Sequence, residues 1–280
     1  MRLVSFDAGA GPRAALLRDG RIYDIWGEAF AHVRKEDRTV YALLQGGLLH
    51  EVSPVEHEGV PVEGVDLLAP IPRPGKIICI GLNYRSHAAE QGAEPPETPT
   101  FFAKFANAFR PPVATVELPA WSERVDYEAE VAFVIGARCK DVPEERALDF
   151  VAGYMLFNDL SARDYQFLTP QWMPGKVFDG SAPCGPALVT RDEVAHDAIE
   201  LELQLNGETL QQASTADLVH SVPALVTYLS KLMTLEPGDV ISTGTPAGVG
   251  SLRDPPVWLK PGDEVVVSSS QLGRLETKIA

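Results

Sequence analysis

Residues 126–136 have the sequence DYEAEVAFVIG, an alternation that predicts a β-strand with two unlike faces. One face is wholly apolar and consists of Tyr127, Ala129, Val131, Phe133 and Ile135. The other face begins with Glu128 and Glu130, whose Cα atoms would lie roughly 6.5–7 Å apart on a strand. Ala132 and Val134 follow on that second face, so the strand is expected to become buried on both sides.

Two carboxylates entering a buried strand need an explanation. Burying Glu128 and Glu130 without a partner is costly unless a cation neutralises them. The pattern alone is equally compatible with a solvated strand end, and the two interpretations stay open at this point.

Further strands and few helices surround this segment, which predicts an α+β fold that is mostly β. Ser221 and Pro223 predict a helix over about 222–234, because serine caps helices and proline favours their first turn. Residues 93–120, with prolines at 95, 96, 99, 111 and 112, predict a long loop. The strand signals are 76–82, 151–159, a hairpin over 201–211 that turns at Asn206-Gly207, and the segments after the Pro-Gly-Asp turns at 237–239 and 261–263.

The chain is expected to divide into two domains. Residues 1–70 indicate a small β-rich N-terminal domain, with an Asp19-Gly20 hairpin turn. The proline-rich segment 69–76 suits a stiff linker, which places the boundary near 70–74 and a larger domain over 71–280.

Composition excludes several classes of protein. The 280 residues carry 24 Lys and Arg against 39 Asp and Glu, a net charge of −15, which disfavours nucleic acid and anionic membranes as partners. No apolar run approaches the roughly 18 residues of a transmembrane helix, and the N-terminus does not resemble a secretory signal. Three cysteines without a CxxC motif indicate a reducing compartment, so a cytoplasmic protein is expected.

Asp159 follows an apolar strand and adds a third carboxylate to the candidate site. Three oxygen ligands without nearby Cys or His suit Mg²⁺ or Mn²⁺ better than Zn²⁺. A structural role is equally compatible with the local sequence, because Asp159 could instead cap a following helix.

Three further segments carry candidate chemistry. On a helix, His87 and Glu90 would share one face, where a carboxylate raises the basicity of an imidazole; a surface ion pair is the ordinary alternative. Lys176 lies in a glycine-framed loop and could neutralise a substrate carboxylate or an oxyanion, although such lysines are usually solvated. The glycine-rich turn 242–250 lacks a P-loop lysine but offers N–H groups to a carboxylate.

Taken together, six motifs in order resemble the fumarylacetoacetate hydrolase family over about residues 70–280. They are GLNYRSHAAE (81–90), PTFFAK (99–104), DYEAEVAFVIG (126–136), NDLSARDYQ (158–166), GKVFD (175–179) and ISTGTPAGVG (241–250). The resemblance implies a mixed β-sandwich roll with a small N-terminal domain, and a homodimer.

The resemblance also implies roles for nine residues. Glu128, Glu130 and Asp159 match the metal carboxylates, usually with Mg²⁺ or Mn²⁺; His87 and Glu90 match the water-activating dyad; Lys176 matches the active-site lysine; Arg163, Gln166 and Thr245 match substrate contacts.

The reaction expected from these roles is metal-dependent hydrolysis of a C–C bond in an acylpyruvate, a small anionic 2-oxo acid. The three carboxylates would be balanced by the divalent cation and Lys176. Oxaloacetate decarboxylation, or enol–keto isomerisation of an unsaturated dicarboxylate, would use the same metal site and is the alternative. A non-catalytic binding protein of the same fold is a weaker third hypothesis, and the acyl group is not readable from the sequence.

Overall fold

The computed structural model describes residues 1–9, 11–54 and 58–280, and β-structure dominates it as predicted. About 35% of the residues lie in strands and 21% in helical segments, which confirms the α+β, mostly β class. In the described part, the largest sheet has twelve strands. Ten of them follow one another in the order β4 (Val60–Pro61), β3 (Arg21–Tyr23), β2 (Pro12–Arg18), β1 (Arg2–Asp7), β14 (Ala182–Thr190), β12 (Val151–Asn158), β11 (Ala129–Ile135), β17 (Val240–Ser242), β6 (Ile77–Gly81) and β7 (Thr100–Lys104); β5 (Leu67–Leu68) pairs with β1 and β8 (Phe109–Arg110) with β14.

A second sheet and a short strand pair complete the β-structure. The second sheet runs β16 (Glu208–Ser214), β15 (Glu200–Leu205), β18 (Glu264–Ser269), β19 (Gly273–Ile279) and β9 (Val113–Val116), and the pair is β10 (Val125–Asp126) with β13 (Ser161–Ala162). The α-helices are α1 (Val40–Gln45), α2 (Arg85–Glu90), α3 (Arg163–Gln166) and α4 (Val222–Leu232). Short 3₁₀ helices cover Glu28–Phe30, Lys35–Asp37, Leu48–Glu51, Val62–Gly64, Ala106–Ala108, Glu144–Phe150, Met173–Gly175, Thr215–Asp217 and Gly250–Leu252.

Several local predictions are confirmed. Strands β6 and β12 occupy the apolar runs at 76–82 and 151–159, and β15 and β16 form the predicted hairpin. At its turn Asn206 and Gly207 have φ of 52° and 83°, the left-handed conformation that such a turn requires. The Ser221 side chain accepts a hydrogen bond from the Ala224 backbone N–H and caps α4 as expected.

Strand β11 is buried on both faces. Its residues Val131, Phe133 and Ile135 belong to the core that includes residues of the second sheet, whereas Ala132 and Val134 belong to a second core. Glu128 and Glu130 therefore do not lie at a solvated strand end, and that alternative is excluded.

The strand predicted over 126–136 is interrupted, which the alternating pattern does not indicate. Asp126 ends β10, and β11 begins only at Ala129. Between them, the N–H of Glu128 donates to Asn158 Oδ1 at 3.2 Å and the N–H of Ala129 to Gln211 Oε1 at 2.9 Å. Side-chain amides here accept the hydrogen bonds that a neighbouring strand would otherwise accept. Glu128 therefore lies outside the sheet, although its backbone N–H is still hydrogen-bonded.

The long loop predicted for 93–120 is wrong in part, because β7, β8 and β9 lie within it. The prolines that suggested a loop lie just outside these strands: Pro99 precedes β7, and Pro111 and Pro112 separate β8 from β9. Proline is excluded from strand interiors but not from their ends, so a proline-rich segment can still contain short strands.

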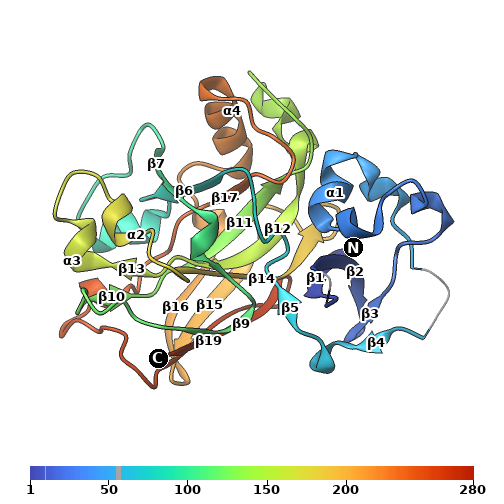
Figure 1. Ribbon diagram of the computed structural model, residues 1–280. Coiled ribbons are helices and arrows are strands. Elements are labelled where there is room, and N and C mark those ends of the chain that lie inside the picture. The colour runs from blue at the N-terminus through green and yellow to red at the C-terminus, as the bar shows by residue number, and fades with distance from the viewer. Residues whose placement is uncertain (10, 55–57) are drawn as a thin grey trace.

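The N-terminal residues form a lobe at one side of the molecule, blue in Figure 1, and α2 and α3 lie at the opposite side. Strand β1 pairs with β14, so the N-terminal strands extend the large sheet, and Leu3 and Leu43 share a core with Phe157. The domain boundary near 70–74 stays a prediction.

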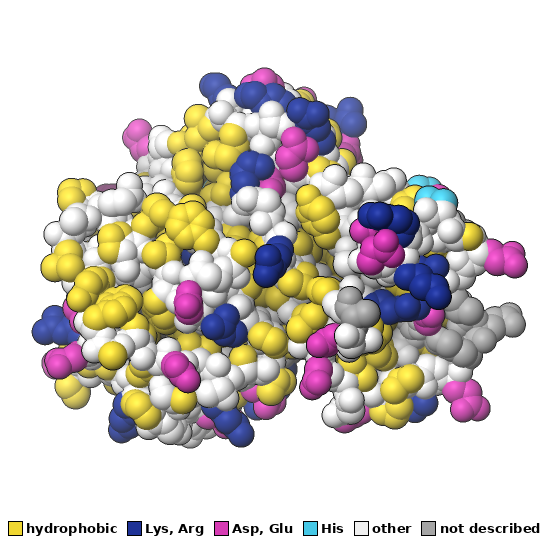
Figure 2. All heavy atoms as spheres, viewed as in Figure 1, with side chains coloured by type: hydrophobic (Ala, Val, Ile, Leu, Met, Phe, Trp, Pro, Cys, Tyr) yellow, Lys and Arg dark blue, Asp and Glu magenta, His cyan; other side chains and the backbone are white. Residues whose placement is uncertain are grey.

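Charged side chains of both signs are distributed over the surface seen in Figure 2. Figure 2 shows acidic and basic side chains interspersed over one face of the molecule, without a single broad basic patch there. Among the helices of the described residues, none combines the length and the apolar character that crossing a membrane requires.

Candidate active site

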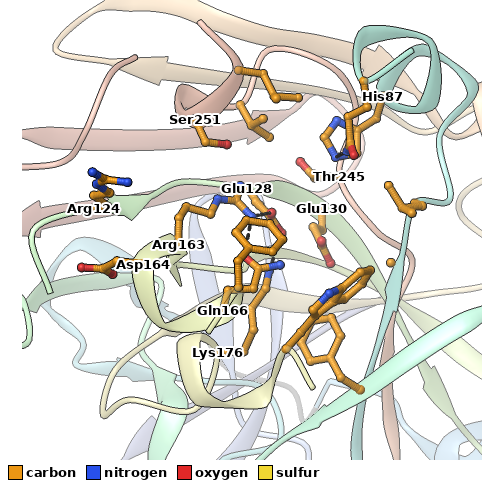
Figure 3. Close-up of a pocket in the computed structure, with 18 of the residues that line it drawn as sticks. His87, Arg124, Glu128, Glu130, Arg163, Asp164, Gln166, Lys176, Thr245 and Ser251 are labelled. Carbon is orange, nitrogen blue, oxygen red and sulfur yellow. Dashed lines mark hydrogen bonds and ion pairs between the residues drawn. The ribbon is translucent and has the colours of Figure 1, made fainter. Parts of the chain in front are cut away.

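A cavity of about 520 Å³ opens beside the start of β11 and collects most of the predicted site residues. It is lined by residues at the end of β6, on α2 and α3, and on the segment 245–258, as Figure 3 shows for the principal side chains. A volume of this size suits a small organic molecule. The predicted residues that line it are His87, Glu128, Glu130, Arg163, Gln166, Lys176 and Thr245.

Glu128, Glu130 and Asp159 form the acidic triad that the sequence predicts. One carboxylate oxygen from each residue lies within 4.8 Å of an oxygen from each of the other two. Glu128, Glu130 and Asp159 are buried, with exposed fractions of 6%, 1% and 0%. Strand pairing explains the proximity, because Ala129 lies opposite Asn158 and the Asp159 N–H donates to the Glu128 carbonyl at 2.9 Å. The pairing of β11 with β12 thus brings Asp159 next to Glu128, although the two residues are far apart in the sequence.

Three buried cations neutralise the triad in part. Lys176 Nζ lies 2.8 Å from Glu128 Oε2 and 2.8 Å from Asp159 Oδ2. Lys104 Nζ lies 2.7 Å from Asp159 Oδ1, and Arg163 Nη1 lies 2.7 Å from Glu128 Oε1. Buried carboxylates persist only with such partners.

Titration behaviour follows from these contacts. Burial pushes the pKa of Glu128 upward, but Lys176 and Arg163 outweigh burial and hold that pKa below its usual value. Burial acts to lower the pKa of Lys176, yet Asp159 and Glu128 raise it above its usual value, so the ammonium stays charged. Arg163 is partly neutralised by Asp126, because its Nε and Nη2 donate to Asp126 Oδ2 at 2.9 and 2.8 Å.

Glu130 is the least neutralised member of the triad. Burial, reinforced by Asp159 and Glu128, raises its pKa well above the usual value, and its neutral partner Ser242 donates a hydrogen bond to it. Glu130 therefore binds a proton more readily than an ordinary glutamate, and a divalent cation at the triad would compete with that proton.

The residues present fit a divalent cation. The donor set consists of three carboxylates, the ligands that Mg²⁺ and Mn²⁺ prefer. The ammonium of Lys176 lies between two of them and shows that a positive charge is accommodated at that position. Glu128, Glu130 and Asp159 would hold the ion, and the donor set is equally suited to Mg²⁺ and Mn²⁺.

His87 and Glu90 lie on α2 and contact each other. His87 Nδ1 is 3.1 Å from Glu90 Oε2, and His87 Nε2 is 2.9 Å from the amide nitrogen of Gln91. Since that amide donates, the network assigns the proton of the neutral imidazole to Nδ1 and the lone pair to Nε2. His87 is only 7% exposed and lines the cavity together with Gln91, whose amide occupies the Nε2 lone pair.

Contacts with distant segments fix α2 in place. The Ser86 N–H donates to Asp217 at 3.0 Å, and Arg85 donates to the Leu218 carbonyl. Glu90 Oε1 accepts from the Gly248 N–H at 2.9 Å. The glycine-rich turn thus binds a carboxylate through its backbone, as its sequence suggested, and the carboxylate is one of the protein's own.

The predicted substrate contacts also reach the cavity. Arg163 Nη1 donates to Gln166 Oε1 at 2.9 Å, which orders both side chains on α3. Thr245 Oγ1 donates to the Ala129 carbonyl at 3.0 Å and accepts from Gln211, so its position is fixed relative to β11.

Sequence reasoning missed several residues of the site. Lys104, at the end of β7, contacts Asp159. Asp126 accepts hydrogen bonds from Arg163, and Ser242 donates one to Glu130. Trp172 lines the cavity and lies against Gly81, where a Cβ atom would be 2.2 Å from the indole ring. Lys104 ends the motif 99–104, but nothing in its spacing indicates a site.

The pH dependence of stability should report on Glu130. Its folded-state pKa is raised, so the folded metal-free protein holds a proton that the unfolded chain loses above the ordinary glutamate pKa of 4.5. The free energy of unfolding should therefore fall as pH rises above that value. Urea unfolding of metal-stripped protein at several pH values measures this slope, which should be smaller for Glu130→Gln and with added Mn²⁺. Identical slopes for Glu130→Gln and the unmodified protein would contradict the assignment.

The chain is similar to known proteins in both sequence and structure. The family model described as fumarylacetoacetate hydrolase C-terminal matches residues 76–280. A Bos taurus protein named mitochondrial oxaloacetate tautomerase is 40% identical, over 100% of this chain and 91% of its own. A solved fumarylacetoacetate hydrolase from Exiguobacterium antarcticum is 33% identical, with a TM-score of 0.85 and coverage of 100% and 99%. A solved 5-carboxymethyl-2-hydroxymuconate delta-isomerase from Mycobacterium smegmatis is 34% identical, with a TM-score of 0.79 and the same coverage. The chain belongs to the fumarylacetoacetate hydrolase family of enzymes.

Proposed function

We propose that this protein catalyses keto–enol proton transfer in a 2-oxo dicarboxylic acid such as oxaloacetate, with a divalent cation at the triad. The observation that carries the proposal is the position of His87, which lines the same cavity as Glu128 and Glu130 and contacts Glu90 through Nδ1. The bovine relative, aligned over the whole chain, is named an oxaloacetate tautomerase, which supports this substrate class.

The chain's own residues supply the proton transfer. His87 Nε2 takes a proton from the carbon next to the 2-oxo group, and Glu90 stabilises the imidazolium that results. The electron pair moves onto the 2-oxygen, which takes up a proton from water to give the enol, and the imidazolium returns its proton to the hydroxide that is left. Lys176 faces the cavity as a permanent cation and would stabilise the charge that develops on that oxygen. A divalent cation, when bound, would polarise the 2-oxo group as a Lewis acid.

Local charge favours an anionic substrate. The three triad carboxylates contact Lys176 and Lys104, while Arg163 and Asp126 largely cancel each other. With a divalent cation the cluster would have a net charge of +1, whereas the sequence predicted neutrality because Lys104 was not included. The site would therefore attract an anion although the chain has a net charge of −15.

Hydrolysis of a C–C bond in a 2,4-diketo acid is the second candidate. The same Nε2 of His87, held by Glu90, could deprotonate a water molecule instead of a carbon acid. The Exiguobacterium protein of similar structure is named a hydrolase, which supports this candidate.

One experiment distinguishes the candidates. Metal-stripped, Mg²⁺-loaded and Mn²⁺-loaded protein is incubated with enol-oxaloacetate and, separately, with acetylpyruvate, while ultraviolet absorbance and NMR follow the enol, pyruvate and acetate. Faster loss of the oxaloacetate enol without pyruvate supports tautomerisation, and acetate plus pyruvate from acetylpyruvate supports hydrolysis. Pyruvate from oxaloacetate indicates decarboxylation. A Glu128→Ala variant with the same metal corrects for catalysis by free ions, and equal rates with it would refute the site.

Lys176→Met should weaken substrate binding. The variant removes a buried cation that faces the cavity, so the KM for the anionic substrate should rise about ten-fold or more. Steady-state kinetics at saturating Mn²⁺ measures this change, and Lys278→Met on the exposed face of β19 is the control. If kcat and KM both stay unchanged, Lys176 has no role in substrate binding.

A further inference from the structure

Lys104 is a buried cation that the proposed reaction does not use. It ends β7, and its side chain is 0% exposed, so its ammonium does not reach a bound substrate. Lys104 lies opposite Ile77 on β6, and its Nζ contacts Asp159, which follows β12. Fully buried lysines are rare unless they have a specific partner, so the burial of Lys104 needs an explanation in its contacts.

The contacts of Lys104 tie the triad to the active-site lysine. Its Nζ lies 2.7 Å from Asp159 Oδ1 and donates to the carbonyl of Ser181 at 3.0 Å and to Ser181 Oγ at 2.8 Å. It also donates to the backbone carbonyls of Leu160 and Lys176. One ammonium thus fixes a metal-binding carboxylate and the backbone that carries Lys176.

The two oxygens of Asp159 have different partners as a result. Oδ1 contacts Lys104, which is enclosed by protein, whereas Oδ2 contacts Lys176, which lines the cavity. Lys176 donates a hydrogen bond to Oδ2, whereas Lys104 lies beside Oδ1 as an ion-pair partner. Both ammonium groups would therefore act on a cation held by Asp159.

We propose that Lys104 is a positioning residue that acts through Asp159 by its charge and keeps the loaded site net positive. The inference rests on the metal site of the proposed function. Lys104 should lower the affinity for the cation, because it repels a second positive charge nearby, and should raise the affinity for an anionic substrate.

A purely structural role predicts the opposite change in metal binding. If Lys104 only held Asp159 in shape, its loss would disorder a ligand, and the cation would bind equally or less tightly. If its charge matters, a neutral replacement leaves the triad more negative, and the cation binds more tightly. The direction of the change therefore decides between the two roles.

The test compares Lys104→Gln and Lys104→Met with Lys76→Gln in the full chain. Glutamine removes the charge but keeps N–H donors for the carbonyls of Leu160 and Ser181, so one variant preserves the local hydrogen bonding. Lys76 is a matched control, since it pairs with the buried Asp239 at 2.6 Å, and Asp239 is outside the triad. Circular dichroism establishes that each variant is folded.

Mn²⁺ binding to metal-stripped protein is measured by electron paramagnetic resonance, and oxalate binding to Mn²⁺-loaded protein by calorimetry. Lys104→Gln should bind Mn²⁺ about ten-fold more tightly and oxalate about ten-fold more weakly, while Lys76→Gln changes neither. Mn²⁺ binding by Lys104→Gln that is equal to or weaker than that of the unmodified protein would overturn the inference and leave the proposed function standing. Absence of Mn²⁺ binding by the unmodified protein would overturn both.

Discussion

Replacing Glu128 with alanine is expected to lower the catalytic rate about 10³-fold or more and to abolish tight binding of the divalent cation. Glu128 is one of three carboxylates in the donor set and is 6% exposed, so no solvent-side group replaces it. The fold should persist, because Lys176 retains Asp159 and Arg163 retains Asp126 as partners. Steady-state kinetics and Mn²⁺ titration of the variant measure the two losses.

Two further variants serve as controls for Glu128→Ala. Glu128→Gln keeps the shape of the side chain and removes its charge, so it should fail nearly as completely as alanine. Glu123→Gln changes an exposed glutamate five residues earlier and should leave both properties unchanged. Full activity of Glu128→Ala, or activity that persists after removal of divalent metal, would exclude the triad as the metal site.

Replacing His87 with alanine is expected to slow proton transfer about 10²–10⁴-fold, the usual contribution of a positioned general base. His87 is the proposed base and lines the cavity, and Mn²⁺ binding should be unaffected because His87 is outside the triad. Alanine is compatible with α2, in which Ala88 and Ala89 already follow, and Glu90 keeps its hydrogen bond from Gly248. Rates of enol loss measured over a range of pH report the effect.

The dyad predicts a second, smaller effect at Glu90. Glu90→Gln keeps a hydrogen-bonding group beside Nδ1 but removes the charge that stabilises the imidazolium formed in the reaction, so kcat should fall, though less than for His87→Ala. His50→Gln, at a histidine whose side chain is 77% exposed, is the control and should change nothing. If His87→Ala loses hydrolysis but retains tautomerisation, the base acts on water only, and the second candidate function gains support.

Short-range signals in the sequence predicted most of the architecture. Alternation identified the strand that carries Glu130, an Asn-Gly pair identified the hairpin at 206–207, and a serine cap identified α4. Each depends on neighbouring residues only, since side-chain alternation and turn conformation are local properties. Six ordered motifs then indicated the family that the comparisons show.

Two features of the fold depend on residues that are distant in the sequence, and no local pattern predicted them. The strand is interrupted at Glu128 because the side-chain amides of Asn158 and Gln211, 30 and 82 residues from their donors, accept from the N–H groups of Glu128 and Ala129. The short strands within 93–120 form only against partners elsewhere in the chain, so proline positions alone predicted a loop.

Periodicity and turn residues along the chain predict the mostly β fold, and the resemblance carried by six motifs predicts the family and the nine candidate site residues. The distribution of charge in the site follows only from the folded arrangement, in which Lys176 contacts two triad carboxylates, Arg163 contacts Asp126 as well as Glu128, and Lys104 contacts Asp159. A charge interaction depends on distance and burial in space, and strands distant in sequence must pair before either quantity exists.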